Sequence, residues 1–150
     1  MNIVILHYHL NRGGVTSVIA NHLRALSSAG VDGIRVMILF GGRKTGWGDS
    51  LTAELSDRDV SLAVIPGLEY DEGQSPRSSE LAESVRQTLD QAGFTPHTTI
   101  VHVHNHALGK SVSLPGALRE LAEAGYRLLL QIHDFAEDFR PEVYGRLTPA

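Results

Sequence analysis

The chain has 150 residues, of which 42% are hydrophobic and 20% are charged, with a formal net charge of -4 at pH 7. This size and composition fit one globular domain with a hydrophobic core and exclude a chain that is disordered throughout. The 13 basic residues are spread along the chain, which argues against a nucleic-acid or anionic-lipid partner. The sequence contains no cysteine, which removes disulfides and thiolate metal sites. With a first apolar run too short to span a bilayer and no signal-peptide pattern, we expect a cytoplasmic protein.

The N-terminal part of the chain sets the pattern for the rest. Residues 1–6 form an apolar run, which predicts a buried strand. After a polar stretch, Gly13 and Gly14 precede residues 16–29, where apolar side chains recur at helical spacing, and Gly30 suits the left-handed end of a helix. We therefore expect a strand, a glycine turn and a helix.

The same alternation continues along the chain. Apolar runs predict four more strands, at residues 35–40, 60–65, 99–104 and 127–132. Helical spacing predicts three more helices, at residues 51–55, 80–92 and 114–124. Strands that alternate with helices in this way are typical of a parallel sheet with right-handed crossovers. We predict an α/β fold over residues 1–150, a single Rossmann-like three-layer sandwich with a mainly parallel sheet of about five strands and helices on both faces.

Two segments show neither period and predict surface loops. Residues 41–48 are rich in glycine, and residues 68–79 are rich in glycine, proline and polar residues. We expect both loops to be flexible; stacking of Trp47 on a sugar ring is the alternative role for the first loop. Ser78 or Ser79 is suited to cap the helix that follows.

The glycine turn is the first candidate binding element. Ligands of open parallel sheets bind beyond the carboxyl ends of the strands, where Gly13 and Gly14 fall. Uncovered N–H groups at the start of a helix bind phosphate groups. The turn has neither the spacing of a dinucleotide fingerprint nor a P-loop lysine. We expect it to face a phosphate-bearing ligand; the alternative is a tight turn that only lets helix and strand pack.

Histidines form the second candidate group. Five of the eight histidines fall at or just beyond a predicted strand end: His7, His9, His104, His106 and His133. Imidazole suits proton transfer, sugar-hydroxyl binding and metal ligation near neutral pH. We expect His104 and His133, at the ends of strands that flank one crevice, to be functional. Structural roles are expected for His22, His97 and His102.

Two other functions are compatible with these residues. A metal-dependent hydrolase would draw its ligands from His7, His9, His104, His106 and Asp134, with a metal-bound water as nucleophile. A non-catalytic module would bind a nucleotide at the glycine turn. Because His-x-His pairs alone are weak metal motifs, we expect no metal.

Three stretches together resemble a known family. Residues 9–15 follow the first strand, residues 101–106 end the fourth, and residues 130–134 end the fifth. In order and placement they are similar to the N-terminal domain of retaining GT-B glycosyltransferases, the large family that contains sucrose-phosphate synthases and bacterial mannosyltransferases. The similarity is spread over the whole chain, although each motif is short.

The resemblance implies a hexosyltransferase-like enzyme that moves a sugar from a nucleotide-sugar donor to an acceptor hydroxyl. It implies no separate cofactor, and a sugar-type or lipid-type acceptor that binds mainly to this domain. The donor diphosphate would approach Gly13, Gly14 and Val15. His104 and His133 would be the catalytic residues beside the donor sugar. Acceptor or sugar contacts would come from four further residues: His9, Asn105, His106 and Asp134.

The chain departs from the family in its extent. Members of the family carry most of their nucleotide contacts in a C-terminal domain, which 150 residues cannot contain. We therefore expect an incomplete N-terminal, acceptor-side domain that is inactive alone and needs the missing C-terminal domain. An exposed sheet edge after the fifth strand would allow it to pair with a second copy as a homo-oligomer.

Overall fold

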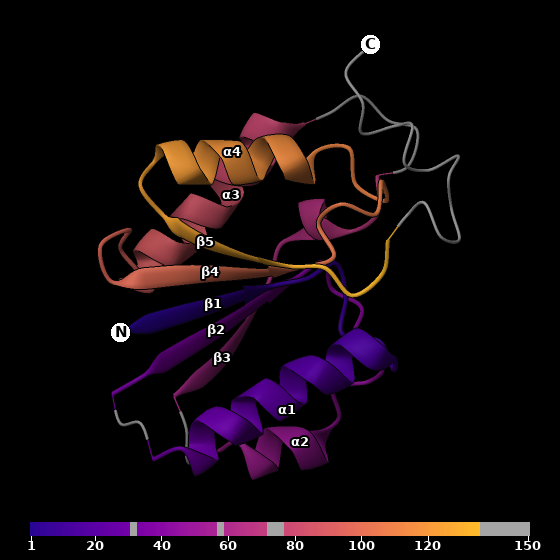
Figure 1. Ribbon diagram of the computed structural model, residues 1–150, viewed down its shortest axis with the longest axis vertical. Coiled ribbons are helices and arrows are strands. Elements are labelled where there is room, and N and C mark those ends of the chain that lie inside the picture. Colours follow the sequence, from indigo (N-terminus) through magenta and orange to yellow (C-terminus); the bar gives the residue numbers. More distant parts are fainter. Residues whose placement is uncertain (31–32, 57–58, 72–76, 136–150) are drawn as a thin grey trace.

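Five parallel strands form one sheet in the computed structural model, which describes residues 1–30, 33–56, 59–71 and 77–135. The strands are β1 (Asn2–Leu6), β2 (Arg35–Phe40), β3 (Val60–Val64), β4 (Thr99–His104) and β5 (Arg127–Gln131). Their order in the sheet is β3-β2-β1-β4-β5 (Figure 1). The chain runs outward from β1 through β2 to β3 and then returns to the other side of β1. The switch in direction therefore lies between β1 and β4, the place where such sheets bind ligands.

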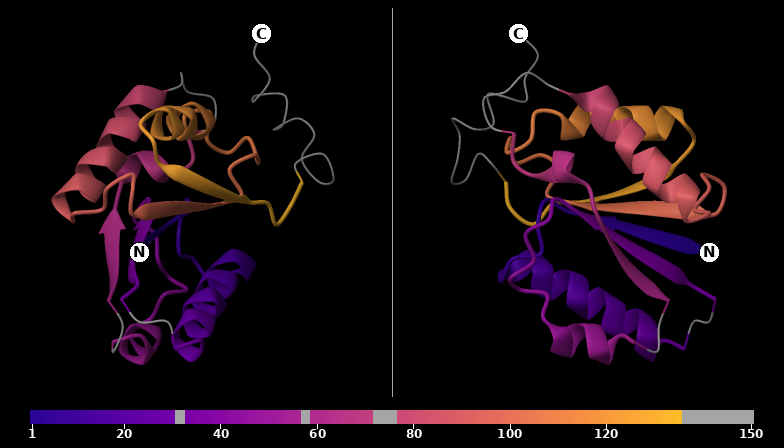
Figure 2. Two further views of the ribbon diagram at one scale, coloured as in Figure 1. Left: turned by 60° about the vertical axis from the view of Figure 1, so that its left-hand side comes forward. Right: turned by 180° about the vertical axis from the view of Figure 1, so that it is seen from behind.

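Helices cover both faces of the sheet, as the sequence predicts. The helices α1 (Gly14–Ser28) and α2 (Asp49–Glu54) lie on one face, and α3 (Ser78–Gln91) and α4 (Leu114–Glu123) lie on the other (Figures 1 and 2). A short 3-10 helix, η1 (Pro66–Leu68), follows β3. The predicted Rossmann-like α/β sandwich is confirmed, and each predicted strand and helix is present with ends that shift by at most two residues.

Alternating side chains of the strands feed two hydrophobic cores. On the α3 and α4 face, Leu6, Leu39 and Val103 are fully buried and pack with the apolar sides of these helices. On the α1 and α2 face, Ile5 and Ile38 pack with the apolar side of α1. Because strand side chains alternate between faces, His102 and His104 share the α1 face with Ile5. The register places His102 directly beside Ile5 on β1 and Leu129 on β5.

Two local predictions are wrong. Trp47 is 5% exposed and belongs to the core on the α1 and α2 face, so it is not available for sugar stacking. Neither Ser78 nor Ser79 caps α3, because both lie within its first turn and the cap position is Arg77. The Ser78 hydroxyl instead donates to the Ser113 carbonyl, 2.9 Å away, and joins the start of α3 to the start of α4.

The loop predicted for residues 68–79 is only partly as expected. Residues 72–76 lie outside the described residues. Leu68 is fully buried, and Glu69, Tyr70 and Asp71 are half-buried against neighbouring loops. The start of this segment is therefore a packed element of the carboxyl edge of the sheet.

The β5 edge of the sheet carries exposed apolar side chains. Leu129 and Leu130 are 52% and 46% exposed, and Ile132 and Phe135 beyond the strand are also exposed. In the part of the chain that is described, no helix combines the length and the apolar character needed to cross a bilayer.

Candidate functional site

A cavity of about 220 Å³ opens at the switch point between β1 and β4. Its walls come from the loop after β1, the start of α1, the segment after η1 and the loops after β4 and β5. The lining residues are His7, Tyr8, His9, Asn11, Gly13, Gly14, Val15, Thr16, Tyr70, Asn105, Leu108, Lys110 and Asp134. The cavity thus brings together segments that are far apart in the sequence, at the edge where the fold places its ligands.

The glycine turn forms one wall of this cavity. No side chain caps α1. The first backbone N–H that donates within the helix is that of Ser17, which bonds to the Gly13 carbonyl at 3.1 Å. The preceding N–H groups, from Gly14 to Thr16, have no acceptor among the described residues. They provide an uncovered helix N-terminus that favours an anion.

The protein itself does not require glycine at either position of the turn. Gly13 has a φ of 169°, which is extended backbone that any residue adopts. A Cβ atom on Gly13 would lie 3.9 Å from the nearest heavy atom, and one on Gly14 would meet nothing within 4 Å. The missing side chains leave open space in front of the helix, which suits close approach of a ligand to the backbone.

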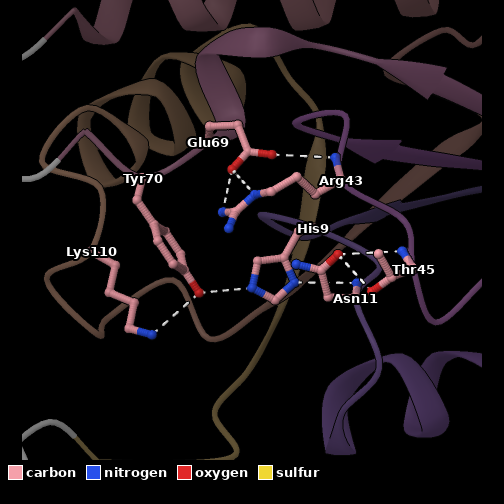
Figure 3. Close-up of polar contacts among 7 residues, drawn as sticks. All are labelled: His9, Asn11, Arg43, Thr45, Glu69, Tyr70 and Lys110. Carbon is pink, nitrogen blue, oxygen red and sulfur yellow. Dashed lines mark hydrogen bonds and ion pairs between the residues drawn. The ribbon is translucent and has the colours of Figure 1, made fainter.

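A polar chain of three residues forms the opposite wall. The Lys110 ammonium donates to the Tyr70 hydroxyl at 3.2 Å, and that hydroxyl lies 2.9 Å from His9 Nε2 (Figure 3). The Lys110 nitrogen also lies 4.5 Å from the centre of the Tyr70 ring. Its contacts among the described residues are with a phenol rather than a carboxylate, so its positive charge is available to a ligand.

The hydrogen bonds of His9 determine where its proton lies. The Asn11 N–H donates to His9 Nδ1 at 3.4 Å, so Nδ1 is an acceptor and the neutral ring carries its proton on Nε2. His9 then donates to the Tyr70 oxygen, which also accepts from Lys110. The Tyr70 proton is therefore free to donate to a ligand. Burial, and next the nearby Arg43 charge, lower the pKa of His9 and favour this neutral form.

Contacts of Arg43 and Thr45 hold the loops around these three side chains. Arg43 Nε donates to Glu69 Oε2 at 2.7 Å, and the Arg43 guanidinium lies 5.3 Å from the Tyr70 ring centre. The Thr45 backbone N–H and hydroxyl both donate to Asn11 Oδ1, at 3.3 and 3.2 Å (Figure 3). The loop after β2 is thereby attached to the loops that carry His9 and Tyr70.

Asn105 joins the ends of β4 and β5. Its φ of 56° is the left-handed region, which asparagine tolerates better than most residues. The side-chain oxygen accepts the His133 N–H at 2.7 Å, and the side-chain amide donates to Asp134 Oδ2 at 3.1 Å. The Tyr8 hydroxyl donates to the Asn105 carbonyl at 3.0 Å. Asn105 therefore fixes the position of the Asp134 carboxylate at the cavity.

His104 and His133 lie next to each other behind this wall. His104 Nδ1 is 2.7 Å from His133 Nε2, and the two rings stack with centres 5.0 Å apart. His104 is fully buried, whereas His133 is half-buried. Burial, and next the neighbouring His102, lower the pKa of His104 to about 3, so this ring is neutral at physiological pH.

His7 extends the group of imidazoles toward the cavity. Its ring centre lies 5.5 Å from that of His9 and 6.2 Å from that of His104, and its Nδ1 is 3.3 Å from the His104 carbonyl. Burial lowers the pKa of His7 to about 4. Ring contacts therefore run without a break from the cavity at His9 to the buried His104.

The predicted site residues fall into two groups. Those that line the cavity are His9, Gly13, Gly14, Val15, Asn105 and Asp134. The cavity lining does not include His104, His133 or His106. His104 and His133 are connected to the cavity through Asn105, while the His106 Nδ1 atom is buried without a partner among the described residues.

Sequence reasoning missed Tyr70 and Lys110. They lie in segments that the sequence presents only as loops, and 40 residues separate them. The available signal is their place after the third and fourth strands, whose carboxyl ends share an edge of the sheet.

A larger cavity of about 400 Å³ lies beside η1 and α3. It shares Glu69, Tyr70 and Asp71 with the loops described above, but it contains neither the glycine turn nor an imidazole. The smaller cavity holds the glycine turn, two imidazoles and Lys110, so that cavity is the candidate site.

The fold and this cavity define an α/β domain with a cavity at its topological switch point, the place where such sheets bind ligands. The chain is similar to mannosylglucosyl-3-phosphoglycerate synthase of Petrotoga mobilis, a glycosyltransferase, with 32% identity over 148 residues. The match covers 96% of this chain and 28% of the relative, so the chain spans less than a third of that enzyme. No protein-family profile and no solved structure matches the chain.

Proposed function

We propose that this chain is the acceptor-side part of a retaining GT-B glycosyltransferase, which transfers a sugar from a nucleotide-sugar to an acceptor hydroxyl. The observation that carries the proposal is the cavity at the β1–β4 switch point, where the uncovered start of α1 faces a wall of hydrogen-bond donors. The similarity to a glycosyltransferase over nearly the whole chain supports the same class of reaction.

The donor diphosphate is proposed to lie at the glycine turn. Open space in front of Gly13 and Gly14 allows its oxygens to reach the backbone N–H groups from Gly14 to Thr16. A second hollow, of about 230 Å³, lies on the other side of the turn and includes Arg12. The negative charge that develops on the leaving diphosphate would be stabilised by these N–H groups and by Arg12.

The acceptor is proposed to be a sugar that carries a phosphate or carboxylate group. Lys110 offers a positive charge, while Tyr70 and His9 offer hydroxyl and imidazole groups on the same wall. The relative's name includes a phosphoglycerate, a group that carries both a phosphate and a carboxylate. The polar wall and its charge favour such an acceptor over a lipid-type one.

His133 and His104 are proposed to act together at the donor sugar. The half-buried His133 is the ring that a sugar hydroxyl can reach, and Asn105 fixes its backbone. The fully buried His104 holds His133 through the 2.7 Å contact between ring nitrogens and acts as a positioning residue. Asp134 is proposed to bind an acceptor hydroxyl, because its carboxylate lines the cavity.

The acceptor site can be tested with the 150-residue chain alone. We expect 3-phosphoglycerate to bind in the millimolar range, as half of a cleft should, and to shift NMR signals of residues that line the cavity, whereas glycerol should not. Lys110→Met should weaken binding at least tenfold. The matched variant Lys44→Met, on an exposed loop, should bind as the parent does.

Transfer itself is proposed to need a second, downstream domain, because the match covers only 28% of the relative. With the downstream domain present, we expect sugar transfer from a nucleotide-sugar, and Gly14→Val should reduce kcat/KM by at least tenfold because its side chain occupies the space of the diphosphate. A downstream sequence without a glutamate-bearing nucleotide motif would contradict the proposal. Equal binding of 3-phosphoglycerate by the parent and Lys110→Met would contradict the proposal that the acceptor is acidic.

A further inference from the structure

A second cluster of imidazoles lies between α1 and the face of the sheet at β4, outside the cavity lining. His22 comes from α1, and His102 and His104 come from β4. One ring nitrogen from each residue lies within 4.8 Å of the other two. The ring centres of His102 and His104 are 4.3 Å apart, and that of His22 is 5.4 Å from His102 and 5.9 Å from His104.

Neighbouring side chains leave a nitrogen lone pair on His102. Its Nε2 lies 2.8 Å from Gln131 Oε1. With the Gln131 amide in this orientation, the oxygen can only accept, so Nε2 carries the proton of the neutral ring. Nδ1 of His102 is then an unprotonated nitrogen with no partner among the described residues.

His104 has a free ring nitrogen as well. Its Nε2 is buried and has no hydrogen-bond partner among the described residues, while its Nδ1 contacts His133. The residue is 0% exposed, so water from the bulk does not satisfy this nitrogen. An orphaned polar atom in such a place destabilises the fold, and a ligand bound to it would remove this cost.

We propose that His22, His102 and His104 bind one divalent transition-metal ion of the zinc class. Three neutral imidazoles suit Zn²⁺, Co²⁺ or Ni²⁺, whereas the absence of oxygen ligands from the trio disfavours Mg²⁺ and Ca²⁺. Burial is the main cause that lowers the pKa of both His102 and His104, and it keeps them in the neutral form that ligates.

The geometry requires a small adjustment to close around an ion. The three ring nitrogens lie within 4.8 Å of one another. In a tetrahedral zinc site with bonds of about 2.0–2.1 Å, the ligand nitrogens are closer together than this. His22 is half-buried on the surface of α1, so its ring can move toward the two strand histidines. A water molecule would complete the coordination.

The outer contacts match those of a metal centre. Metal-bound histidines usually donate their second N–H to an oxygen or nitrogen acceptor that orients the ring. Gln131 provides this acceptor for His102, and His133 provides it for His104. A bound ion would place the shared proton on His104 Nδ1 and make His133 Nε2 the acceptor. The metal site itself does not depend on the proposed sugar transfer.

The test is metal binding by the purified 150-residue chain after treatment with a chelator. We expect one Zn²⁺ per chain by calorimetry and a Co²⁺ absorption spectrum typical of a site with nitrogen ligands. His22→Leu should weaken Zn²⁺ binding at least 100-fold, and Gln131→Leu about tenfold or more, since it removes only the contact that orients His102. His97→Leu, an exposed histidine, is the matched control and should bind as the parent does.

Three results would overturn the metal site. The first is less than 0.5 ion per chain at saturating Zn²⁺, where about one is the expectation for a three-histidine site. The second is unchanged affinity in His22→Leu. The third is binding that His9→Leu removes and His22→Leu retains, which would place the ion in the cavity. Circular dichroism of each variant checks the fold, and 3-phosphoglycerate binding by His22→Leu separates this inference from the proposed function.

Discussion

His7 shows how a buried imidazole couples folding to pH. Desolvation lowers its pKa from the ordinary 6.5 to about 4, so the unfolded chain binds a proton more readily than the folded chain between these values. Above about pH 6.5 the ring is neutral in both states, so its titration does not affect the free energy of unfolding. As the pH falls from 6.5 toward 4, the unfolded chain takes up the proton and the free energy of unfolding decreases. The buried His104 acts in the same direction, down to about pH 3.

We expect acid to destabilise the protein well before its carboxylates are protonated. Between pH 7 and pH 5, His7 alone should remove about 2 kcal/mol from the free energy of unfolding. Urea unfolding at several pH values, with a chelator present, measures this slope. His7→Gln should flatten it, and His97→Gln should not, because that side chain is exposed. An equal slope in the parent and His7→Gln would show that burial of this ring is not the cause.

Single residues also mark the limit of what the sequence predicts. Gly13 and Gly14 are recognisable because glycines between a strand and a helix suggest a ligand in a parallel sheet. The glycine-rich neighbours of Trp47 predict an exposed loop, whereas its burial depends on distant residues of the core. Tyr70 and Lys110 owe their roles to each other across the fold, and neither has a local motif.

Asp71 links the segment after η1 to the start of α4. Its carboxylate accepts the Val112 N–H at 2.6 Å and the Ser113 N–H at 3.1 Å, and it also accepts the Ser113 hydroxyl. Tyr70 precedes it in the chain, so the same contacts hold the phenol at the cavity. Hydrogen bonds to a charged group are worth about 1.5–3 kcal/mol each, although their sum is not additive.

We predict that Asp71→Ala lowers the free energy of unfolding by about 2–4 kcal/mol and weakens 3-phosphoglycerate binding. Asp59→Ala is the matched control, because its ion pair with Arg35 is exposed and should be worth less than about 1 kcal/mol. Denaturant unfolding and NMR titration measure the two effects. A variant as stable as Asp59→Ala would mean that the loop is held by other contacts.

The elements were more predictable than their arrangement. Largely apolar runs identify all five strands, including β3 and β5, whose positions at the sheet edges leave their side chains partly exposed. The order β3-β2-β1-β4-β5 is set by long-range pairing, and no local pattern in the sequence specifies it. The position of the switch point, and therefore of the cavity between β1 and β4, became clear only from the structure.

At the scale of the whole molecule, the β5 edge is the surface most suited to association. Leu129 and Leu130 are about half exposed on an edge strand whose outer side pairs with no other described strand, a combination that favours pairing with a second copy. We expect the 150-residue chain to form dimers through β5, with a dissociation constant that Leu129→Lys raises at least tenfold. Analytical ultracentrifugation over a range of concentrations measures it.

The opposite edge provides the control for this prediction. Val64 on β3 is 54% exposed, so Val64→Lys places the same charge on a comparable apolar position. We expect Val64→Lys to leave the dissociation constant unchanged. An equal effect of both variants would indicate non-specific association, and a monomer at all concentrations would exclude pairing through β5.

The imidazole rings around His104 affect its protonation. After burial, the pKa of His104 is lowered by four rings that surround it: His102, His133, His7 and His22. A positive charge on any of these rings therefore makes protonation of His104 less favourable still. If the proposed sugar transfer is confirmed, the pH dependence of its rate would report the surroundings of His104 as a whole rather than one histidine. Replacing His22, whose ring lowers the pKa of His104, should therefore move that pKa back toward its ordinary value.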